Sequence, residues 1–175
     1  MTKEAEWGLI TTYDPSMAKK AAEMFNAFNE LWPGGFGGGT PYTEQRVHDW
    51  LDKSSALADL IAMDPEGNLC GYCGVYPHWK DPGAAYISIL GVTPKAKGKK
   101  FGKRLLLKAL EICQDKAITR LDLHTWGGNL EAVPLYKKIG LFWVPDTSVY
   151  MQDFLPGLLQ LPFAQEWFAK HPDWY

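Results

Sequence analysis

The sequence is poor in cysteine, and its net charge is close to zero. Its 175 residues include three cysteines and carry a formal net charge of -2. Neither a disulfide framework nor a general affinity for nucleic acid is expected from such a chain. No run of about 18 apolar residues occurs, and residues 1–6 lack the apolar core of a secretory signal. These absences predict a cytoplasmic protein without a membrane partner.

Two of the cysteines, Cys70 and Cys73, have the spacing of a redox or zinc motif. They lie in an apolar run, residues 69–76, which is typical of a strand. Positions three apart on a strand point to opposite faces, so the two sulfur atoms are expected to diverge. The third cysteine, Cys113, lies on the apolar face of a predicted helix. The sequence therefore predicts buried structural thiols and no metal site.

An apolar fraction of 46% and a charged fraction of 22% are typical of a globular chain with one main domain. Runs of apolar residues and turn signals predict a succession of strands and helices. Strands are predicted at residues 7–13, 57–63, 69–76, 84–92, 120–126, 142–144 and 148–154. Helices are predicted at residues 15–31, after Thr43, at 101–114 and from Asn129 to Gly140.

The stretch from Val92 to Arg104 joins a predicted strand to a predicted helix through a glycine- and lysine-rich loop. Seven of the 18 lysines and arginines fall between Lys95 and Lys108. The free backbone N–H groups of such a loop and of the first helical turn, together with the helix dipole, favour an anion. The spacing fits neither a Walker A nor a Rossmann glycine motif. A phosphorylated ligand is the expected partner, and nucleic acid is not, because no aromatic residues interleave the lysines.

The loop resembles motif A of the GNAT superfamily of acyl-CoA-dependent N-acetyltransferases, which runs Arg/Gln-x-x-Gly-x-Gly/Ala. Lys97 stands at the Arg/Gln position and Gly102 at the last one. Lys100 departs from the pattern, because it stands where the family has its first glycine. Its backbone N–H can still donate, but its Cβ limits how closely a pyrophosphate can approach.

A second segment resembles motif B of the same superfamily, Asn-x-x-Ala-x-x-Leu-Tyr-x-Lys-x-Gly. It begins at Asn129, contains Tyr136 and ends at Gly140. Pro134 lies inside this predicted helix and is expected to kink it. The two motifs occur in the family's order, and the resemblance extends from about Trp7 to Asp153.

The resemblance implies an α/β (α+β) GNAT fold. Its central mixed, mostly antiparallel sheet would be splayed between the fourth and fifth strands, with helices on both faces. It also implies acetyl-CoA as co-substrate. The residues then expected to bind it are Leu90, Gly91, Val92, Lys97, Gly98, Lys99, Lys100, Phe101, Gly102, Lys103, Asn129 and Tyr136.

The implied reaction is direct acetyl transfer to a primary amine of a small molecule or peptide, within a ternary complex. Tyr136 matches the family's general acid, which protonates the leaving thiolate. His124 lies within the predicted strand at residues 120–126, where it alternates with Leu121 and Leu123 and therefore faces away from them. Histidine ordinarily titrates near neutral pH, which suits the base that deprotonates the acceptor. The alternative is a histidine with a structural hydrogen bond.

The segment between the first two predicted helices contains five glycines in residues 34–39. In the family this segment borders the acceptor site. One interpretation is a mobile lid in which Phe36 and Tyr42 contact the acceptor. The other is a plain flexible linker.

Residues 1–154 are expected to form the acetyltransferase domain, and residues 155–175 a C-terminal helical extension. The apolar residues of this tail either pack on the domain or contact a second subunit or a further domain. A second function remains open from the sequence alone. The chain would then be a GNAT-like domain that binds acyl-CoA without catalysis inside a larger protein.

Overall fold

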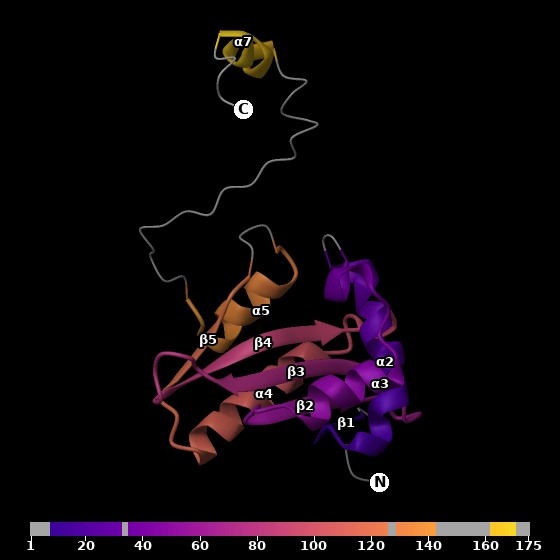
Figure 1. The fold of residues 1–175 in the computed structure, drawn as a ribbon. Coiled ribbons are helices and arrows are strands. Elements are labelled where there is room, and N and C mark those ends of the chain that lie inside the picture. The colour runs from indigo at the N-terminus through magenta and orange to yellow at the C-terminus, as the bar shows by residue number, and fades with distance from the viewer. Residues whose placement is uncertain (1–7, 33–34, 126–128, 143–161, 171–175) are drawn as a thin grey trace. The chain divides into compact units, whose positions relative to one another are not determined.

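The protein folds around a five-stranded sheet with helices on both faces, as the computed structural model shows (Figure 1). The structure describes residues 8–32, 35–125, 129–142 and 162–170. The strands lie side by side in chain order; β4 and β5 are parallel, and the other neighbouring pairs are antiparallel. The predicted mixed, mostly antiparallel sheet is confirmed.

The elements follow the predicted order. The strands are β1 (Leu9–Thr12), β2 (Ala58–Met63), β3 (Leu69–Pro77), β4 (Ala84–Val92) and β5 (Arg120–Leu123). The α-helices are α2 (Ala18–Ala27), α3 (Glu44–Val47), α4 (Phe101–Asp115), α5 (Ala132–Ile139) and α7 (Pro162–Lys170). The first predicted helix is interrupted, because α2 lies between two 3-10 turns, η1 (Pro15–Met17) and η2 (Phe28–Leu31). A π-helical turn, η4 (His48–Asp52), continues α3.

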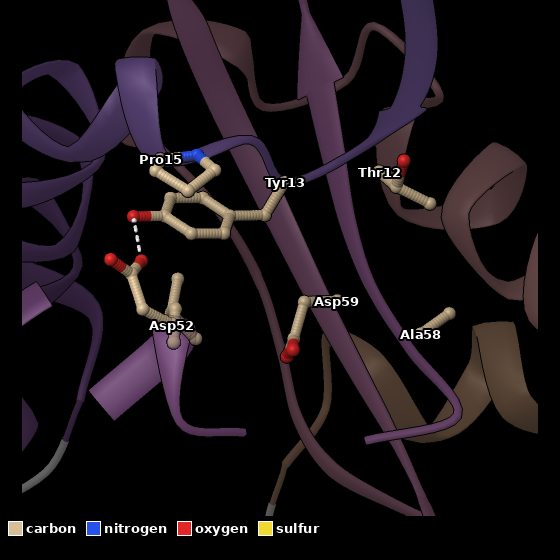
Figure 2. A pocket seen from close by; sticks show the side chains of 7 residues that line it. Thr12, Tyr13, Pro15, Asp52, Ala58 and Asp59 are labelled. Atoms are coloured by element: carbon tan, nitrogen blue, oxygen red, sulfur yellow. Dashed lines mark hydrogen bonds between the residues drawn. The ribbon is translucent and has the colours of Figure 1, made fainter. Parts of the chain in front are cut away.

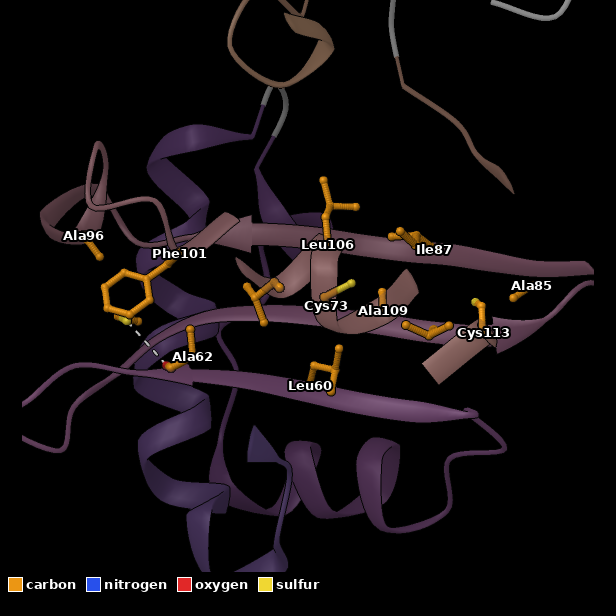
Figure 3. Packing of buried hydrophobic residues seen from close by; sticks show 13 residues of the cluster. Leu60, Ala62, Cys73, Ala85, Ile87, Ala96, Phe101, Leu106, Ala109 and Cys113 are labelled. Carbon is orange, nitrogen blue, oxygen red and sulfur yellow. Dashed lines mark hydrogen bonds between the residues drawn. The ribbon is translucent and has the colours of Figure 1, made fainter. Parts of the chain in front are cut away.

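The alternation of side chains along β2 explains why helices cover both faces of the sheet. Leu60 and Ala62 join a buried cluster with residues of α4, whereas Ile61 joins a cluster with residues of α2 and α3. Figure 3 shows the first cluster, in which Leu106 of α4 lies over the sheet. Burial of these apolar side chains stabilises the fold by roughly 1.5–3 kcal/mol for each large residue.

The expected divergence of the two neighbouring cysteines is wrong. Ala62 pairs with Gly71 and Met63 with Leu69, so a bulge leaves Cys70 without a partner residue on β2. The bulge breaks the alternation of side chains, and both Cys70 and Cys73 pack in the cluster on the α4 side. Burial raises the pKa of each thiol to about 12. The interpretation as buried structural thiols is confirmed, but the predicted reason, that the two sulfur atoms point to opposite faces of the sheet, is not.

Strand β4 pairs with β5 over only the first part of its length. Their last pair joins Ile87 to Leu123, and β4 then continues for five residues, as far as Val92, without a strand partner on that side among the described residues. Ser88, the first residue after the pairing ends, is exposed although it lies in a central strand. This is the splay that the resemblance implies, and it opens the sheet beside β4.

The helix of motif B begins later than predicted. Helix α5 starts at Ala132, which places Pro134 in its first turn. A residue in the first turn has no helical acceptor for its N–H, so proline fits there without the predicted kink.

Residues 141–175 form a second compact unit, which we describe by itself. Helix α7 lies in this unit. Phe142 lies outside any strand. The rest of the two predicted closing strands, residues 143–154, and the side chains of the predicted apolar tail patch lie outside the described residues. The predicted boundary at residue 154 and the predicted burial of the tail stay predictions.

Candidate functional site

The loop between β4 and α4 has two residues in the left-handed backbone region. A 3-10 turn, Pro94–Ala96, leaves β4, after which Gly98 has φ +79° and Lys100 has φ +66°. Lys100 is the residue that departs from the family's glycine. Its conformation gives a physical reason for that glycine, because a side chain in the left-handed region costs about 1–2 kcal/mol.

We therefore expect Lys100→Gly to raise the free energy of unfolding by about 0.5–1 kcal/mol. This value is the backbone strain that the glycine relieves minus the conformational entropy that glycine loses on folding. Ala117→Gly is the matched control, because Ala117 has φ +54° directly after the end of α4. Thermal or urea unfolding of both variants measures the effect. The prediction is contradicted if Lys100→Gly destabilises the protein while Ala117→Gly stabilises it. Contacts of the Lys100 side chain would then stabilise the fold by more than the backbone strain costs.

Helix α4 begins without a side-chain cap and without an acidic residue in its first turn. Its first backbone N–H groups therefore point out of the helix toward the loop. A Cβ atom at Gly102 would lie 3.5 Å from Leu135 and 3.6 Å from Val92, which are ordinary contacts. The fold itself thus has room for a side chain at Gly102, and the glycine is more readily explained by the close approach of a ligand.

The lysines of the loop provide positive charge at the same place. Lys97, Lys99 and Lys103 are exposed. Lys97 forms an ion pair with Glu131, the residue before α5, so motif A and motif B contact each other directly. An exposed ion pair contributes little stability, so Lys97 can exchange Glu131 for a phosphate at low cost.

The predicted cofactor residues on β4 lie where the sheet opens. Leu90 and Val92 are half-buried and pack against the cluster on the α4 side, together with Leu135 and Tyr136 of α5. Gly91 faces the other way, and a Cβ atom there would lie 2.7 Å from the Phe28 ring. Phe101 is buried in the α4-side cluster, so its backbone rather than its ring is available at the loop.

Tyr136 lies on α5, and its ring packs against the cluster on the α4 side. Burial, with a smaller contribution from Cys73, raises the pKa of Tyr136 to about 12. The phenol therefore keeps its proton at neutral pH, as a general acid must.

Asn129 organises the turn that leads into α5. Its Oδ1 accepts the N–H of Ala132 at 3.1 Å, and its Nδ2 donates to Oγ1 of Thr125 at 3.0 Å. Glu131 occupies the N-cap position of α5, so Asn129 supports the start of the helix from the preceding turn. The side chain reaches both the end of the β5 segment and the start of motif B.

His124 is exposed directly after β5, and its Nδ1 lies 3.0 Å from the hydroxyl of Tyr86 on β4. Burial raises the pKa of Tyr86, so this phenol also stays protonated at neutral pH. Sequence reasoning missed Tyr86. The available signal was a tyrosine within the predicted central strand.

The glycine-rich segment is held in place at both of its predicted acceptor residues. Phe36 is buried, stacks on Phe25 at 5.9 Å, and donates its N–H to Asn29. Tyr42 exchanges two backbone hydrogen bonds with the Asn26 side chain. These anchors argue against a plain flexible linker. An acceptor contact through the buried Phe36 ring would require movement, and the acceptor role of both residues stays a prediction.

A pocket of about 310 Å³ lies elsewhere, and none of the predicted site residues lines it (Figure 2). In it the Tyr13 hydroxyl donates to Asp52 at 3.0 Å. Asp59, another wall residue, accepts the Tyr72 hydroxyl at 2.6 Å. These polar groups satisfy one another, so we assign the pocket no role in the chemistry.

Within the described residues, no group of three or more His, Cys, Asp or Glu side chains could hold a metal ion. Among the same residues, no helix is long and apolar enough to cross a membrane.

Comparison with known proteins finds relatives that are acetyltransferases. A mycothiol acetyltransferase of Arthrobacter sp. (strain FB24) is 35% identical over 97 residues, which are 54% of this chain and 29% of that protein. A putative [ribosomal protein bS18]-alanine N-acetyltransferase of Bacillus subtilis (strain 168) is 31% identical over 103 residues, 58% of this chain and 65% of that protein. The chain thus spans less than two thirds of either relative.

Solved structures share the fold. An integron cassette protein of V. cholerae has a TM-score of 0.65 at 20% identity, over 87% of this chain and 98% of that one. A ribosomal-protein-alanine N-acetyltransferase of Brucella melitensis has a TM-score of 0.64 at 20% identity, over 75% of this chain and 83% of that one. The pattern of the acetyltransferase (GNAT) family matches residues 21–141, more than half of the chain. The chain is therefore a member of the GNAT acetyltransferase family.

Proposed function

We propose that this acetyltransferase moves an acetyl group from acetyl-CoA to a primary amine by direct transfer in a ternary complex. The observation that carries the proposal is the splay beyond Ile87. The loop that leads into the uncapped first turn of α4 lies at the far end of the part of β4 that has no strand partner on that side among the described residues. Tyr136 packs on the α4 side of the sheet, and His124 lies exposed at the end of β5 with Tyr86 as its partner.

The residues present fit coenzyme A. The first turn of α4, with Gly102 open above it and Lys97, Lys99 and Lys103 nearby, would hold the phosphates. The edge of β4 at Leu90 and Val92, which has no strand partner among the described residues, would bind an extended amide chain as a strand edge does. When bound, acetyl-CoA supplies an activated acetyl thioester.

The protein's own groups would handle two protons. The Tyr136 hydroxyl holds a proton at neutral pH and would donate it to the leaving thiolate. In the tautomer with hydrogen on Nδ1, His124 donates to the Tyr86 hydroxyl and its Nε2 is free to accept a proton from the acceptor ammonium, directly or through water. The described site residues include no cysteine positioned as a nucleophile, since Cys70, Cys73 and Cys113 are all buried.

The acceptor class is part of the proposal. One relative is named for mycothiol and another for an alanine of a ribosomal protein. Both a small-molecule amine and a peptide amine are therefore candidate acceptors. The free state of the three cysteines agrees with action in a reducing, cytoplasmic compartment.

The proposed base makes a testable demand on pH dependence. A base must be unprotonated to accept a proton, so kcat/KM of the wild-type enzyme should fall as the pH falls. His124→Gln keeps a side chain that can bond Tyr86 but removes the titrating group. We expect this variant to lose about 10²–10⁴-fold in rate and to lose the acidic limb of the profile.

His48→Gln is the matched control, because His48 pairs with Asp52 at 2.8 Å, outside the proposed site. Its profile should match that of the wild type. If the acidic limb persists in His124→Gln with its midpoint unmoved, the acceptor proton goes elsewhere, to water or to Asp122.

A further inference from the structure

An exposed tryptophan lies beside the proposed base. Trp79 follows β3 in the turn before β4, and 61% of its surface is exposed. Its ring centroid lies 5.1 Å from that of Tyr86, in an edge-on arrangement, and 6.5 Å from that of His124. The ring thus borders the pair that the proposed function assigns to proton removal.

The neighbouring residue of the turn between β3 and β4 holds the Trp79 ring in place. The His78 ring stacks on Trp79 at 4.1 Å with an interplanar angle of 21°. His78 is held in turn, because its Nδ1 accepts the N–H of Lys80 at 3.2 Å and its Nε2 lies 3.6 Å from the Asp122 carboxylate. An aromatic platform that is rigid before a ligand arrives loses little entropy on binding.

The two carboxylates beside the platform are paired with an arginine. Arg120 lies 2.7 Å from Asp81 of the turn and 3.0 Å from Asp122 of β5. The recognition that Trp79 offers is therefore stacking and apolar contact rather than attraction of a charged group.

The platform also continues the open floor of the site. Ser88 lies two residues after Tyr86 on β4, at a bulge between the residues that pair with Val75 and Gly74. Ser88 is exposed there, and Tyr86 contacts both Trp79 and His124. A ligand that places an amine at His124 would have its next atoms over this floor, within reach of the indole.

We propose that Trp79 forms an acceptor subsite that binds an aromatic or flat apolar group attached close to the amine to be acetylated. The inference rests on the proposed function, because it takes His124 as the place of the amine. The centroid separation of 6.5 Å between Trp79 and His124 corresponds to about two residues of an extended peptide. The group would thus be a ring a few bonds from a small amine, or the side chain after the reacting residue of a peptide.

Matched acceptors test the subsite on the full 175-residue chain. One pair is 2-phenylethylamine and ethylamine; the other is the amides of alanyl-phenylalanine and alanyl-glycine, which separates a peptide source from a small-amine source. In at least one pair, Trp79→Ala should lower kcat/KM for the aromatic member by about 5- to 10-fold, through KM, and leave the other member nearly unchanged.

Trp79→Phe should restore most of the preference, and it also covers the case in which the alanine variant folds poorly. Leu107→Ala is the control, since Leu107 is 48% exposed on α4 and lies outside the site. An equal loss for both members of each pair would overturn the subsite, because the ring would then only support His124.

Calorimetry in the presence of CoA separates the two proposals. Acetylation without any aromatic preference would remove the subsite and leave the proposed function standing. Tighter binding of an aromatic acceptor to wild type than to Trp79→Ala, without acetylation of any amine, would support the subsite as a binding site and contradict the proposed function.

Discussion

Replacement of Tyr136 by phenylalanine should lower the rate of acetyl transfer by about 10²–10⁴-fold, the usual contribution of a general acid. The substitution removes one oxygen atom and keeps the ring that packs against the α4-side cluster. Acetyl-CoA affinity and the unfolding temperature should therefore stay near their wild-type values. Single-turnover measurement is the appropriate test, because it excludes product release as the limiting step.

Tyr76→Phe provides the matched control for this prediction. The Tyr76 hydroxyl lies 3.0 Å from that of Ser54, so its loss removes a structural hydrogen bond and no proposed catalytic proton. The control should keep the wild-type single-turnover rate. An unchanged rate in Tyr136→Phe would remove this phenol from the mechanism.

Gly102→Asp should abolish measurable binding of acetyl-CoA. The carboxylate would lie in the first turn of α4, where the phosphates of the proposed ligand need free N–H groups and positive charge. The same carboxylate suits a helix N-terminus in the absence of ligand, so the variant should remain folded and even gain about 0.3–1 kcal/mol. Loss of binding together with retained stability is a combination that general misfolding would not produce.

Gly102→Ala separates the effect of charge from that of volume. A methyl group meets only ordinary contacts there, so the protein should tolerate it. Calorimetry should show weaker binding for alanine than for glycine and none for aspartate. Wild-type affinity in the aspartate variant would mean that the phosphates bind elsewhere.

The sequence predicted the parts of this fold that depend on local pattern. The period-two alternation that divides Leu60 and Ile61 between two buried clusters is readable from residue order alone. So is the strand–loop–helix sequence around Gly102. The splay was predicted from the resemblance of the two motifs to the family. Composition and periodicity do not indicate where β4 and β5 separate.

Two features that the sequence did not predict lack a local signal. The bulge that turns Cys70 to the α4 side depends on how β2 pairs with β3, not on the cysteines themselves. The burial of Phe36 depends on an aromatic cluster that includes Phe25 and Phe28, which precede it by eleven and eight residues in sequence and are brought to it by helix packing. A glycine-rich segment gives no hint of such anchoring.

Tyr86 and Trp79 show the same limit within the site. Neither belongs to a motif, and their proximity to His124 arises from the parallel pairing of Tyr86 with Asp122 across β4 and β5. Lys100 is the opposite case. The sequence marked it as a departure from the family pattern, and its left-handed φ angle explains why the family has glycine at this position.

The central claim is that this chain is a catalyst of acetyl transfer to amines. Its most direct test measures the release of free CoA thiol from acetyl-CoA in the presence of a panel of primary amines, with detection of the acetylated amine by mass spectrometry. We predict that at least one amine gives thiol release well above the amine-free rate, with one acetylated product per thiol, and that Tyr136→Phe suppresses it. Tight binding of acetyl-CoA with no amine-dependent thiol release would contradict this account and indicate a domain that binds acyl-CoA without catalysis.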